Sequence, residues 1–250
     1  MPILKYNGLT VSSGGSGSLI LPGFGFAEAG LGIGNPQIYF QLPVGKSIRV
    51  MWGDGASDIY DGIGAFPLDA YHTYTDGRRH TITLAGDYLD LIDIYVINNI
   101  GGDISGWATL TNLTEVGLDA GFSGVQLYGD VSGFSVLTNL TGIDLHASNV
   151  TGDISGWRTL TGLTGSFALY MPGTLVTFES NTAWTGIDAD VYLNDCLLSG
   201  SNVDNALIAF SGGSFANKTI NLGGTNDSRT SASNAALAIL QGNGCTVTVN

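Results

Sequence analysis

The chain has 250 residues, of which 44% are hydrophobic, only 12% are charged and 38 are glycines, and its formal net charge is −13. This composition is typical of a turn-rich β protein and excludes a disordered chain, because the apolar residues recur periodically. With only eight Lys and Arg residues, the chain is not expected to bind nucleic acid or an anionic membrane, since both partners require cationic contacts.

Residues 1–35 are rich in Gly and Ser and carry short apolar segments at Leu19–Leu21 and Phe24–Phe26. Two interpretations remain open: a flexible leader, or an arm that docks on a partner or a neighbouring copy and so makes the protein a homo-oligomer. The segment has no basic region followed by an apolar one, and no apolar run in the chain is long enough to span a membrane. We therefore expect no secretory signal and a soluble protein made in a cytosol.

Residues 36–87 carry an alternating apolar pattern, which predicts the strands of a small sandwich. The predicted strands are 38–42, 48–52 and 80–84. Asp54, Asp58 and Asp61 are candidates for a metal-binding loop, but their spacing matches no EF-hand. We expect turn residues here, and neither a metal nor a cofactor.

A Trp-Gly-Asp-Gly motif begins at Trp52, and His72 and Tyr74 follow it in the order His-x-Tyr. This pattern resembles the PKD-type immunoglobulin-like module. The resemblance implies that Trp52 fills the core and that Asp54 and Gly55 form a tight turn. It also implies that His72 and Tyr74 open the next strand, with Tyr74 as a tyrosine-corner residue.

The centre of the chain repeats one phrase three times. The copies read GDISGWATLTNLTEVGL from Gly102, GDVSGFSVLTNLTGIDL from Gly129 and GDISGWRTLTGLTGSFAL from Gly152. A repeat of this length predicts stacked units that each bury an apolar face against the next. The recurrent Asp is either a turn residue or part of a carboxylate ladder for calcium or glycoside hydrolysis. We expect the turn role at all three positions, Asp103, Asp130 and Asp153.

Apolar-x-apolar pairs mark one predicted strand per repeat, at intervals of 22 to 29 residues. The pairs are Ile94–Val96, Val116–Leu118, Ile143–Leu145, Phe167–Leu169, Val191–Leu193, Ile220–Leu222 and Val247–Val249. From Gly102 to about Gly200 the chain resembles the leucine-rich pattern LxxLxxLxLxxNxLxG, with Ser148 and Cys196 at the Asn position. Gly121 and Pro172 depart from the pattern there. The resemblance implies leucine-rich-type repeats over residues 88–200.

Residues 201–250 are predicted to hold two helices, each followed by a short strand. One helix runs from Ser201 or Asn202 to Phe210, and the other from Thr230 or Ser231 to Leu240. The predicted fold class is therefore mainly β: a small immunoglobulin-like (PKD-like) β-sandwich, then a leucine-rich-repeat-type solenoid with a helical C-terminal cap. The two cysteines, which we expect to be buried and free, are Cys196 and Cys245.

The exposed face of the predicted strands is the candidate binding site. Residues between the paired apolar positions point away from the core, and they form the column Tyr95, Gly117, Asp144, Ala168, Tyr192 and Asn221. Tyr, Asn, Asp and His suit polar recognition, because they combine flat apolar area with hydrogen-bonding groups. The candidate ligand-binding residues are Tyr95, Glu115, Asp144, His146, Tyr170, Tyr192 and Asn194. The alternative is an ordinary solvated sheet face.

The sequence contains no catalytic motif, so we expect no enzyme. The combination of PKD-like and repeat patterns resembles surface and virion adhesion proteins. That resemblance implies a non-enzymatic structural or recognition protein of a bacteriophage virion, such as a tail fibre, adhesin or decoration protein, assembled in the host cytosol. It would bind a host-surface glycan or protein, or neighbouring virion subunits. The alternatives are a bacterial cell-surface repeat adhesin, and a polysaccharide-acting enzyme that pairs Asp144 with Asp119 or Glu115.

Overall fold

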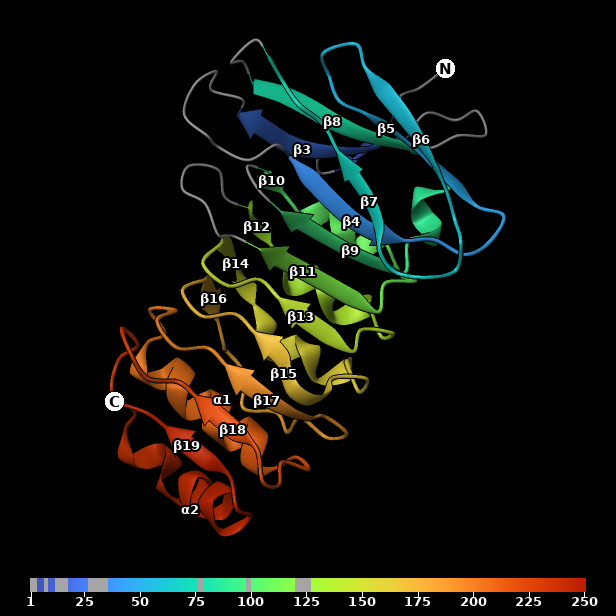
Figure 1. The fold of residues 1–250 in the computed structure, drawn as a ribbon. Helices are drawn as coiled ribbons and strands as arrows, with labels where there is room; N and C mark the ends of the chain where they lie inside the picture. The colour runs from blue at the N-terminus through green and yellow to red at the C-terminus, as the bar shows by residue number, and fades with distance from the viewer. Residues whose placement is uncertain are drawn as a thin grey trace. The chain divides into compact units, whose positions relative to one another are not determined.

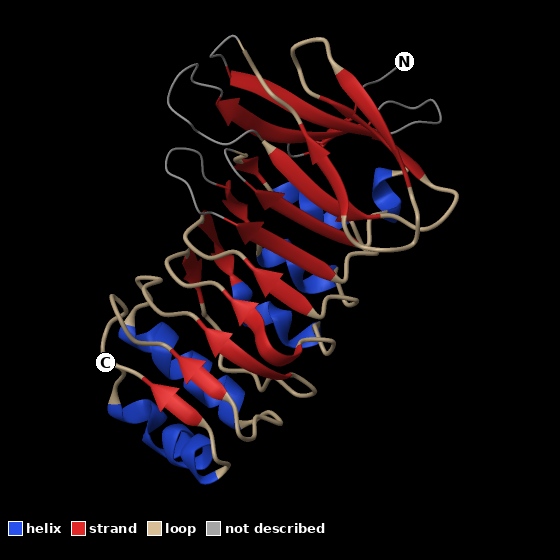
Figure 2. Ribbon diagram, viewed as in Figure 1, coloured by secondary structure: helices blue, strands red, loops and turns tan. Residues whose placement is uncertain are grey.

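The computed structural model describes residues 4–6, 9–11, 18–26, 36–75, 79–97, 100–119 and 127–250. The chain divides into two compact units, Met1–Gly129 and Asp130–Asn250. Among the described residues, the first eight strands follow one another directly, and from Tyr88 onward short helical segments separate runs of one to three strands (Figure 2).

In the described part of the first unit, one sheet consists of six antiparallel strands in the order β1-β2-β3-β8-β5-β6 (Figure 1). These are β1 (Leu4–Tyr6), β2 (Leu9–Val11), β3 (Ser18–Phe26), β8 (Arg79–Gly86), β5 (Ser47–Met51) and β6 (Ser57–Asp61). The predicted alternation is confirmed in β5 and β8, where Ile48, Val50, Ile82 and Leu84 are fully buried. Part of the predicted leader is therefore a strand, since β3 pairs with β8. Docking of residues 1–35 on another copy stays a prediction.

A second sheet of the first unit joins antiparallel and parallel strands in the order β7-β4-β9-β11. These are β7 (Leu68–Tyr71), β4 (Gln37–Gln41), β9 (Asp93–Ile97) and β11 (Glu115–Asp119). The pairs β7–β4 and β4–β9 are antiparallel, whereas β9–β11 is parallel. The remaining elements are η1 (Tyr88–Asp90), β10 (Gly102–Asp103), η2 (Ser105–Thr109) and β12 (Leu127–Asp130), in which β10 and β12 pair in parallel.

In the second unit, five parallel strands follow the order β13-β15-β17-β18-β19 (Figure 1). They are β13 (Gly142–Asp144), β15 (Thr164–Tyr170), β17 (Asp188–Tyr192), β18 (Thr219–Asn221) and β19 (Thr246–Thr248). A small parallel pair is made by β14 (Asn149–Asp153) and β16 (Leu175–Thr177). The helical segments are η3 (Ser132–Val136), η4 (Ile154–Thr159), α1 (Gly200–Ser211), η5 (Ser231–Ser233) and α2 (Asn234–Gly242). In the view of Figure 2, α1 lies behind β18 and α2 lies below β19.

The predicted fold class is wrong. The fold is mixed α/β, with a mostly parallel sheet, smaller sheets and few helices, and neither an immunoglobulin-like sandwich nor a leucine-rich-repeat solenoid is found in the described residues. The strands expected in a separate sandwich are divided between two sheets. Of these, β4 pairs along its whole length with β9, from Gln37 opposite Ile97 to Gln41 opposite Asp93. This pairing satisfies the backbone groups on the outer edge of β9, which would otherwise be unpaired.

Each copy of the repeated phrase forms the same local structure. Its Gly-Asp pair ends a short strand, and a 3-10 helix follows at once, in η2, η3 and η4. The aromatic residues and the leucines of the phrase are buried as predicted. The buried set comprises Trp107, Phe134, Trp157, Leu110, Leu113, Leu137, Leu140, Leu160 and Leu163.

The turn role predicted for the repeated aspartates is confirmed. Asp103, Asp130 and Asp153 each accept a hydrogen bond from the backbone N–H two residues later, at 2.9, 2.8 and 2.9 Å. The glycine of the next copy lies against this carboxylate, and a Cβ on Gly152 would lie 2.2 Å from Oδ1 of Asp130. Glycine is therefore required at Gly152 by close approach as well as by its positive φ of 112°.

Strands of the parallel sheet end in turns that place one residue in the left-handed region. In the second unit these residues are Ala147, Gly173, Asp195 and Gly224, with φ between 52° and 78°. In three of these turns the residue directly after the left-handed one has a buried polar or sulfur-containing side chain: Ser148, Thr174 and Cys196. In the fourth turn the buried side chain is that of Asn226, two residues after Gly224. Asn226 accepts from the N–H groups of Cys196 and Leu198, both at 3.0 Å, and donates to the carbonyls of Leu193 and Leu222, at 2.8 and 2.9 Å.

After β15, the Asn position of the repeat lies two residues later than predicted. It is occupied by Thr174 and not by Pro172. Both cysteines are buried and free, as predicted. Burial raises the pKa of the Cys196 thiol, whose sulfur lies 3.2 Å from the carbonyl oxygen of Met171.

The two predicted helices are confirmed; the first begins earlier than expected, and the second begins as η5 at the expected position. Ser199 caps α1, since its Oγ accepts from the N–H of Asn202 at 3.3 Å. Thr230 caps η5, which leads directly into α2. As predicted, a short strand follows each helix: β18 follows α1, and β19 follows α2 as the last strand of the sheet.

Asp204 joins the two helices of the second unit. Its buried carboxylate accepts from the Thr230 N–H at 3.0 Å, the Thr230 hydroxyl at 2.5 Å and the Ser233 hydroxyl at 2.5 Å. Burial by itself raises the pKa of Asp204, but the hydrogen bonds from Ser233 and Thr230 outweigh it, and the pKa lies below its ordinary value. The ionised carboxylate therefore stabilises the folded state.

Replacing Ala147 by Gly is expected to raise the free energy of unfolding by about 1 kcal/mol, because Ala147 is exposed and has a φ of 52°. Ala238→Gly, at an exposed position within α2, is the matched control and should lower it by roughly 0.5–1 kcal/mol. Urea denaturation of both variants measures the two effects. Equal destabilisation by both substitutions would contradict the assignment of strain to Ala147.

Asp204→Asn is expected to lower the free energy of unfolding at neutral pH by roughly 1–3 kcal/mol, through weaker hydrogen bonds to Thr230 and Ser233. Since the native pKa is depressed, the stabilisation is present above the ordinary carboxyl pKa of about 3.9 and is lost as the pH falls through the native value. Denaturation curves between neutral and acidic pH should show the wild-type advantage shrinking below about pH 4. An advantage independent of pH would contradict this account.

Candidate functional site

The outward face of the second unit differs from the predicted alignment by two residues in β15. Leu169, rather than Phe167, lies opposite Ile143 of β13. A register irregularity within β15 supplies extra residues relative to β17 and causes the shift. Tyr170 therefore occupies the column position predicted for Ala168, which is only 5% exposed.

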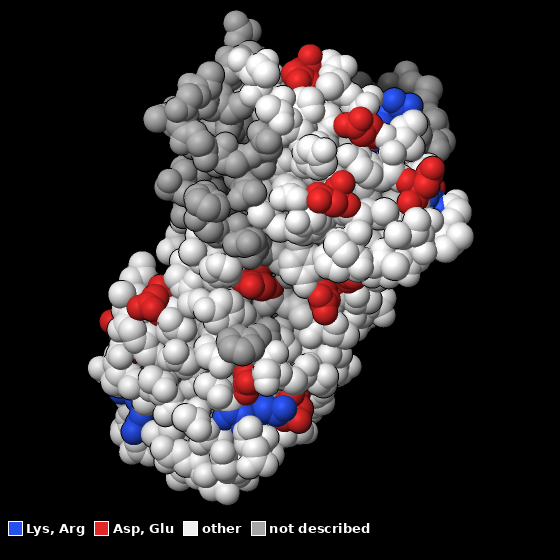
Figure 3. Space-filling view, viewed as in Figure 1, with Lys and Arg blue, Asp and Glu red and all other residues white. Residues whose placement is uncertain are grey.

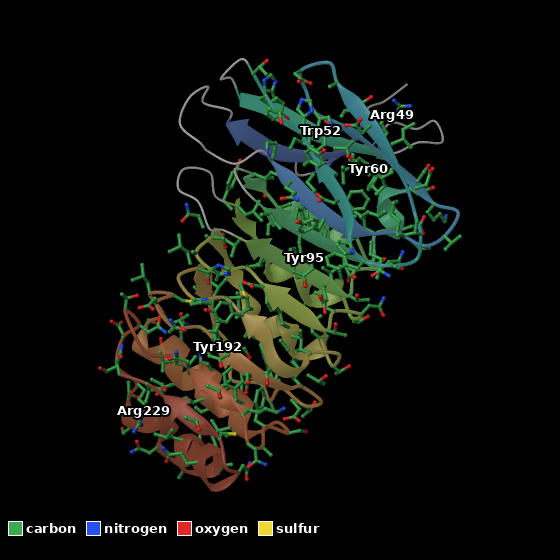
Figure 4. The ribbon with its side chains drawn as sticks, viewed as in Figure 1. Arg49, Trp52, Tyr60, Tyr95, Tyr192 and Arg229 are labelled. Carbon is green, nitrogen blue, oxygen red and sulfur yellow. The ribbon has the colours of Figure 1, made fainter. Side chains whose placement is uncertain are left out.

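The corrected register produces a polar and aromatic strip on the face of the second unit. We call it the tyrosine strip, and it consists of Asp144, His146, Tyr170, Tyr192, Asn194 and Asn221. The ring centroids of Tyr170 and Tyr192 are 5.3 Å apart, and those of His146 and Tyr170 are 5.5 Å apart. Both tyrosines are partly exposed, and Tyr192 is labelled in Figure 4.

Hydrogen bonds hold the polar ends of the tyrosine strip. Nδ1 of His146 lies 2.5 Å from Oδ1 of Asp144, and the two side chains are 31% and 39% exposed. At the other end, Nδ2 of Asn221 donates to Oδ1 of Asn194 at 3.2 Å. Asn194 in turn donates to the Asp195 carboxylate at 2.8 Å. These contacts orient the side chains before any ligand is present.

A different cluster lies on the sheet face of the first unit. Tyr95 packs against Phe66, with ring centroids 5.4 Å apart, and Phe66 packs against Tyr39 at 6.4 Å. The hydroxyl of Tyr95 donates to the Glu115 carboxylate. Gln37 donates to the hydroxyl of Tyr39 at 2.9 Å. We call these five residues the Tyr95 cluster, and Tyr95 is labelled in Figure 4.

Gly117 makes room for the ring of Tyr95, since it lies opposite Tyr95 on the neighbouring strand. A Cβ on Gly117 would lie 2.1 Å from two ring carbons of Tyr95. Two residues before Tyr95 in β9, the Asp93 carboxylate is buried and accepts from the Thr114 hydroxyl at 2.5 Å. Burial raises the pKa of Asp93, and the charge of Glu115 adds to this effect.

The structure thus divides the predicted site residues into two groups. Tyr95 and Glu115 belong to the first unit, and Asp144, His146, Tyr170, Tyr192 and Asn194 belong to the second. Tyr95 contacts Glu115, and successive contacts join Asp144, His146, Tyr170 and Tyr192. The side chain of Asp119, an alternative catalytic partner, lies outside the described residues.

Sequence reasoning missed Tyr39 and Phe66. Tyr39 joins the site through the antiparallel pairing of β4 with β9, where it lies opposite Tyr95. The sequence did contain a local signal for the shifted position of Tyr170. In these strands the first residue of the apolar pair is followed, five positions later, by a buried polar or sulfur-containing residue. These later residues are Ser148, Thr174 and Cys196. Applied to β15, that spacing selects Leu169 as the first apolar residue.

The Trp-Gly-Asp-Gly motif has a structural role. Trp52 is fully buried, and its indole N–H donates to Asp58 at 2.7 Å, while the Tyr74 hydroxyl donates to the Trp52 carbonyl at 2.6 Å. Asp54 accepts from the Ala56 N–H at 2.9 Å and contacts His72 at 2.7 Å, as expected for a turn residue. His72 and Tyr74 lie after the end of β7 and do not open a strand, which corrects the expectation.

Among the described residues, no group of three or more His, Cys, Asp or Glu side chains is placed to hold a metal ion. In the same part of the chain, every helix is too short or too polar to cross a membrane. No family model matches the chain, and neither a curated protein nor a solved structure matches it.

Gly117→Ala is expected to lower the free energy of unfolding by roughly 1–3 kcal/mol, because the new methyl group overlaps the Tyr95 ring. Tyr95→Ala removes the ring, so Gly117→Ala in that background should cost much less. Denaturation of the two single variants and the double variant measures the coupling. Additive effects would contradict the contact between the two residues.

Proposed function

We propose that the protein is a non-enzymatic recognition protein that binds a saccharide on the tyrosine strip of the second unit. The edge-to-face pair of Tyr170 and Tyr192 carries the proposal. Partly exposed aromatic rings provide flat apolar area against which the C–H face of a sugar ring can pack, and their hydroxyls remain polar. A saccharide is the class of ligand that presents both surfaces at once.

The flanking side chains favour the same ligand class. Asp144, His146, Asn194 and Asn221 supply hydrogen-bond donors and acceptors at both ends of the tyrosine pair. Their mutual hydrogen bonds reduce the side-chain freedom that binding would otherwise remove. A preorganised polar and aromatic surface can therefore bind hydroxyl-rich ligands without rearrangement.

Charge favours an uncharged saccharide over an anionic one. The second unit contains nine acidic residues and only three Lys and Arg residues, Arg158, Lys218 and Arg229. Lys218 contacts Asp188 at 3.3 Å, and Arg229 donates to Asn234 at 2.6 Å, so both cations have partners. On the face shown in Figure 3, charged side chains are sparse and separated by wide uncharged areas. An anionic polymer would meet net repulsion there.

Recognition is proposed rather than hydrolysis because a glycosidase needs two carboxyl groups flanking one bond. The tyrosine strip contains a single carboxylate, Asp144, which is engaged by His146. Nearby Asp190 accepts from the Thr219 N–H at 2.7 Å and so holds the backbone. The bacteriophage virion, with a bacterial cell surface as the alternative location, stays a prediction from the sequence.

Tyr170→Ala combined with Tyr192→Ala is expected to weaken saccharide binding at least about tenfold, since each stacked ring contributes roughly 1 kcal/mol or more. The measurement is binding of the full-length protein to an array of neutral and anionic oligosaccharides, followed by calorimetry on the best neutral binder. Tyr128→Ala, which removes an exposed tyrosine of the first unit, is the matched control and should bind as wild type does.

Wild-type protein that binds no member of the array would refute saccharide recognition. Binding that survives the double substitution, with thermal unfolding unchanged, would place the ligand away from the tyrosine strip. Preference for sialylated or uronate-containing oligosaccharides would refute the argument from charge but not saccharide recognition itself.

A further inference from the structure

One row of outward side chains crosses the five parallel strands of the second unit, which lie side by side in Figure 1. Asp144 lies opposite Tyr170, which in turn lies opposite Tyr192. Asn221 lies opposite Tyr192, and Thr248 of β19 lies opposite Asn221 and extends the row beyond the tyrosine strip. Because neighbouring strands are about 4.8 Å apart, the row is about 19 Å long.

This row is the long direction of the sheet face. The strands β13, β18 and β19 have three residues each, so the face is only about 10 Å wide along them. A ligand that follows the row therefore meets more side chains than one that lies along a strand. The face favours a chain that runs across the strands.

The row carries hydrogen-bonding groups on both sides of the tyrosine pair. Every one of its side chains is at least partly exposed, and Asp144 is the only charged one. The side chain of Asn221 is held at both ends: its Nδ2 donates to Oδ1 of Asn194 at 3.2 Å, and its Oδ1 accepts from the N–H of Gly223 at 3.2 Å. The two rings are thus the centre of a longer polar line.

We propose that the ligand of this row is a linear, uncharged polysaccharide with an extended backbone that lies across the strands. This inference rests on the proposed saccharide binding and adds the shape of the ligand. Each sugar residue of an extended β-1,4-linked chain advances by about one strand spacing, so successive residues stay in step with successive strands. The central residues contact Tyr170 and Tyr192, and the flanking residues reach Asp144 on one side and Asn221 and Thr248 on the other.

A single sugar or a coiled chain uses less of the row. A single sugar contacts the two tyrosine rings, whose centroids are 5.3 Å apart, and leaves Asn221 and Thr248 without contact. An α-1,4-linked chain curves, so its later residues turn away from the line of side chains. Each further residue of an extended chain instead adds contacts with side chains that the sheet already holds in place.

The test is calorimetry of the full-length protein with neutral oligosaccharides of one to six residues. The extended series are β-1,4-linked chains of glucose, mannose and xylose. In at least one of them, affinity is expected to rise at least about tenfold between one and four residues, because each added residue forms further hydrogen bonds. The α-1,4-linked glucose series has the same charge and a curved backbone, and as the matched control it should gain less than about threefold.

The double variant Asn221→Ala with Thr248→Ala removes the side chains at one end of the row. It should reduce the gain between two and four residues by at least about threefold. Thr151→Ala, at an exposed position of β14 in the smaller sheet, is the matched control and should keep the full gain. Thermal unfolding checks that each variant is folded, and Thr248→Ala alone decides the question if the double variant is not, since Thr248 is exposed.

Equal affinity for one and for four residues would overturn the extended-chain inference, and so would an equal gain in the curved and extended series. A gain that survives the row substitutions in a folded protein would also overturn it. In each of these cases saccharide recognition stands, because an oligosaccharide is still bound. Absence of binding to every saccharide of the array would instead refute the proposed function, and this inference with it.

Discussion

Each strand of the parallel sheet has to end in a turn whose backbone groups stay hydrogen-bonded although part of the turn is buried. Leaving one such group unpaired costs roughly 1–3 kcal/mol. The second unit meets this constraint with a left-handed residue and a buried polar or sulfur-containing neighbour in successive turns. Asn226 shows the constraint most fully, because its one side chain satisfies four backbone groups, three of them in the segment after β17. Turns of this kind hold successive strands in one register.

A fixed register aligns the outward side chains as firmly as the inward ones, since alternate residues face opposite sides of the sheet. The inward column is apolar and buried. The outward column in the second unit brings Asp144, Tyr170, Tyr192 and Asn221 into one line. The irregularity in β15 is part of this arrangement, because it places a tyrosine where an alanine would otherwise stand. The tyrosine strip is thus a consequence of the same ladder that stabilises the unit.

A parallel ladder also has ends, and the two units treat them differently. In the first unit, β4 runs antiparallel along β9 and covers its edge. In the second unit, β19 has no strand on its outer edge among the described residues, and its surroundings carry no charge.

The sequence by itself determined the features that depend on local period and spacing. These include the repeated phrase with its buried Trp107 and Trp157, the turn role of Asp103, the approximate positions of the seven repeat strands and the two helices. Only the tertiary structure decided how the strands combine. The pairing of β4 with β9 places Tyr39 opposite Tyr95, although more than fifty residues of sequence separate them. The register irregularity in β15 moves Tyr170 into the outward column. Local patterns report which face of a strand is apolar. They carry no information on which distant strand will satisfy its edge, because backbone hydrogen bonds between strands are the same for every side chain.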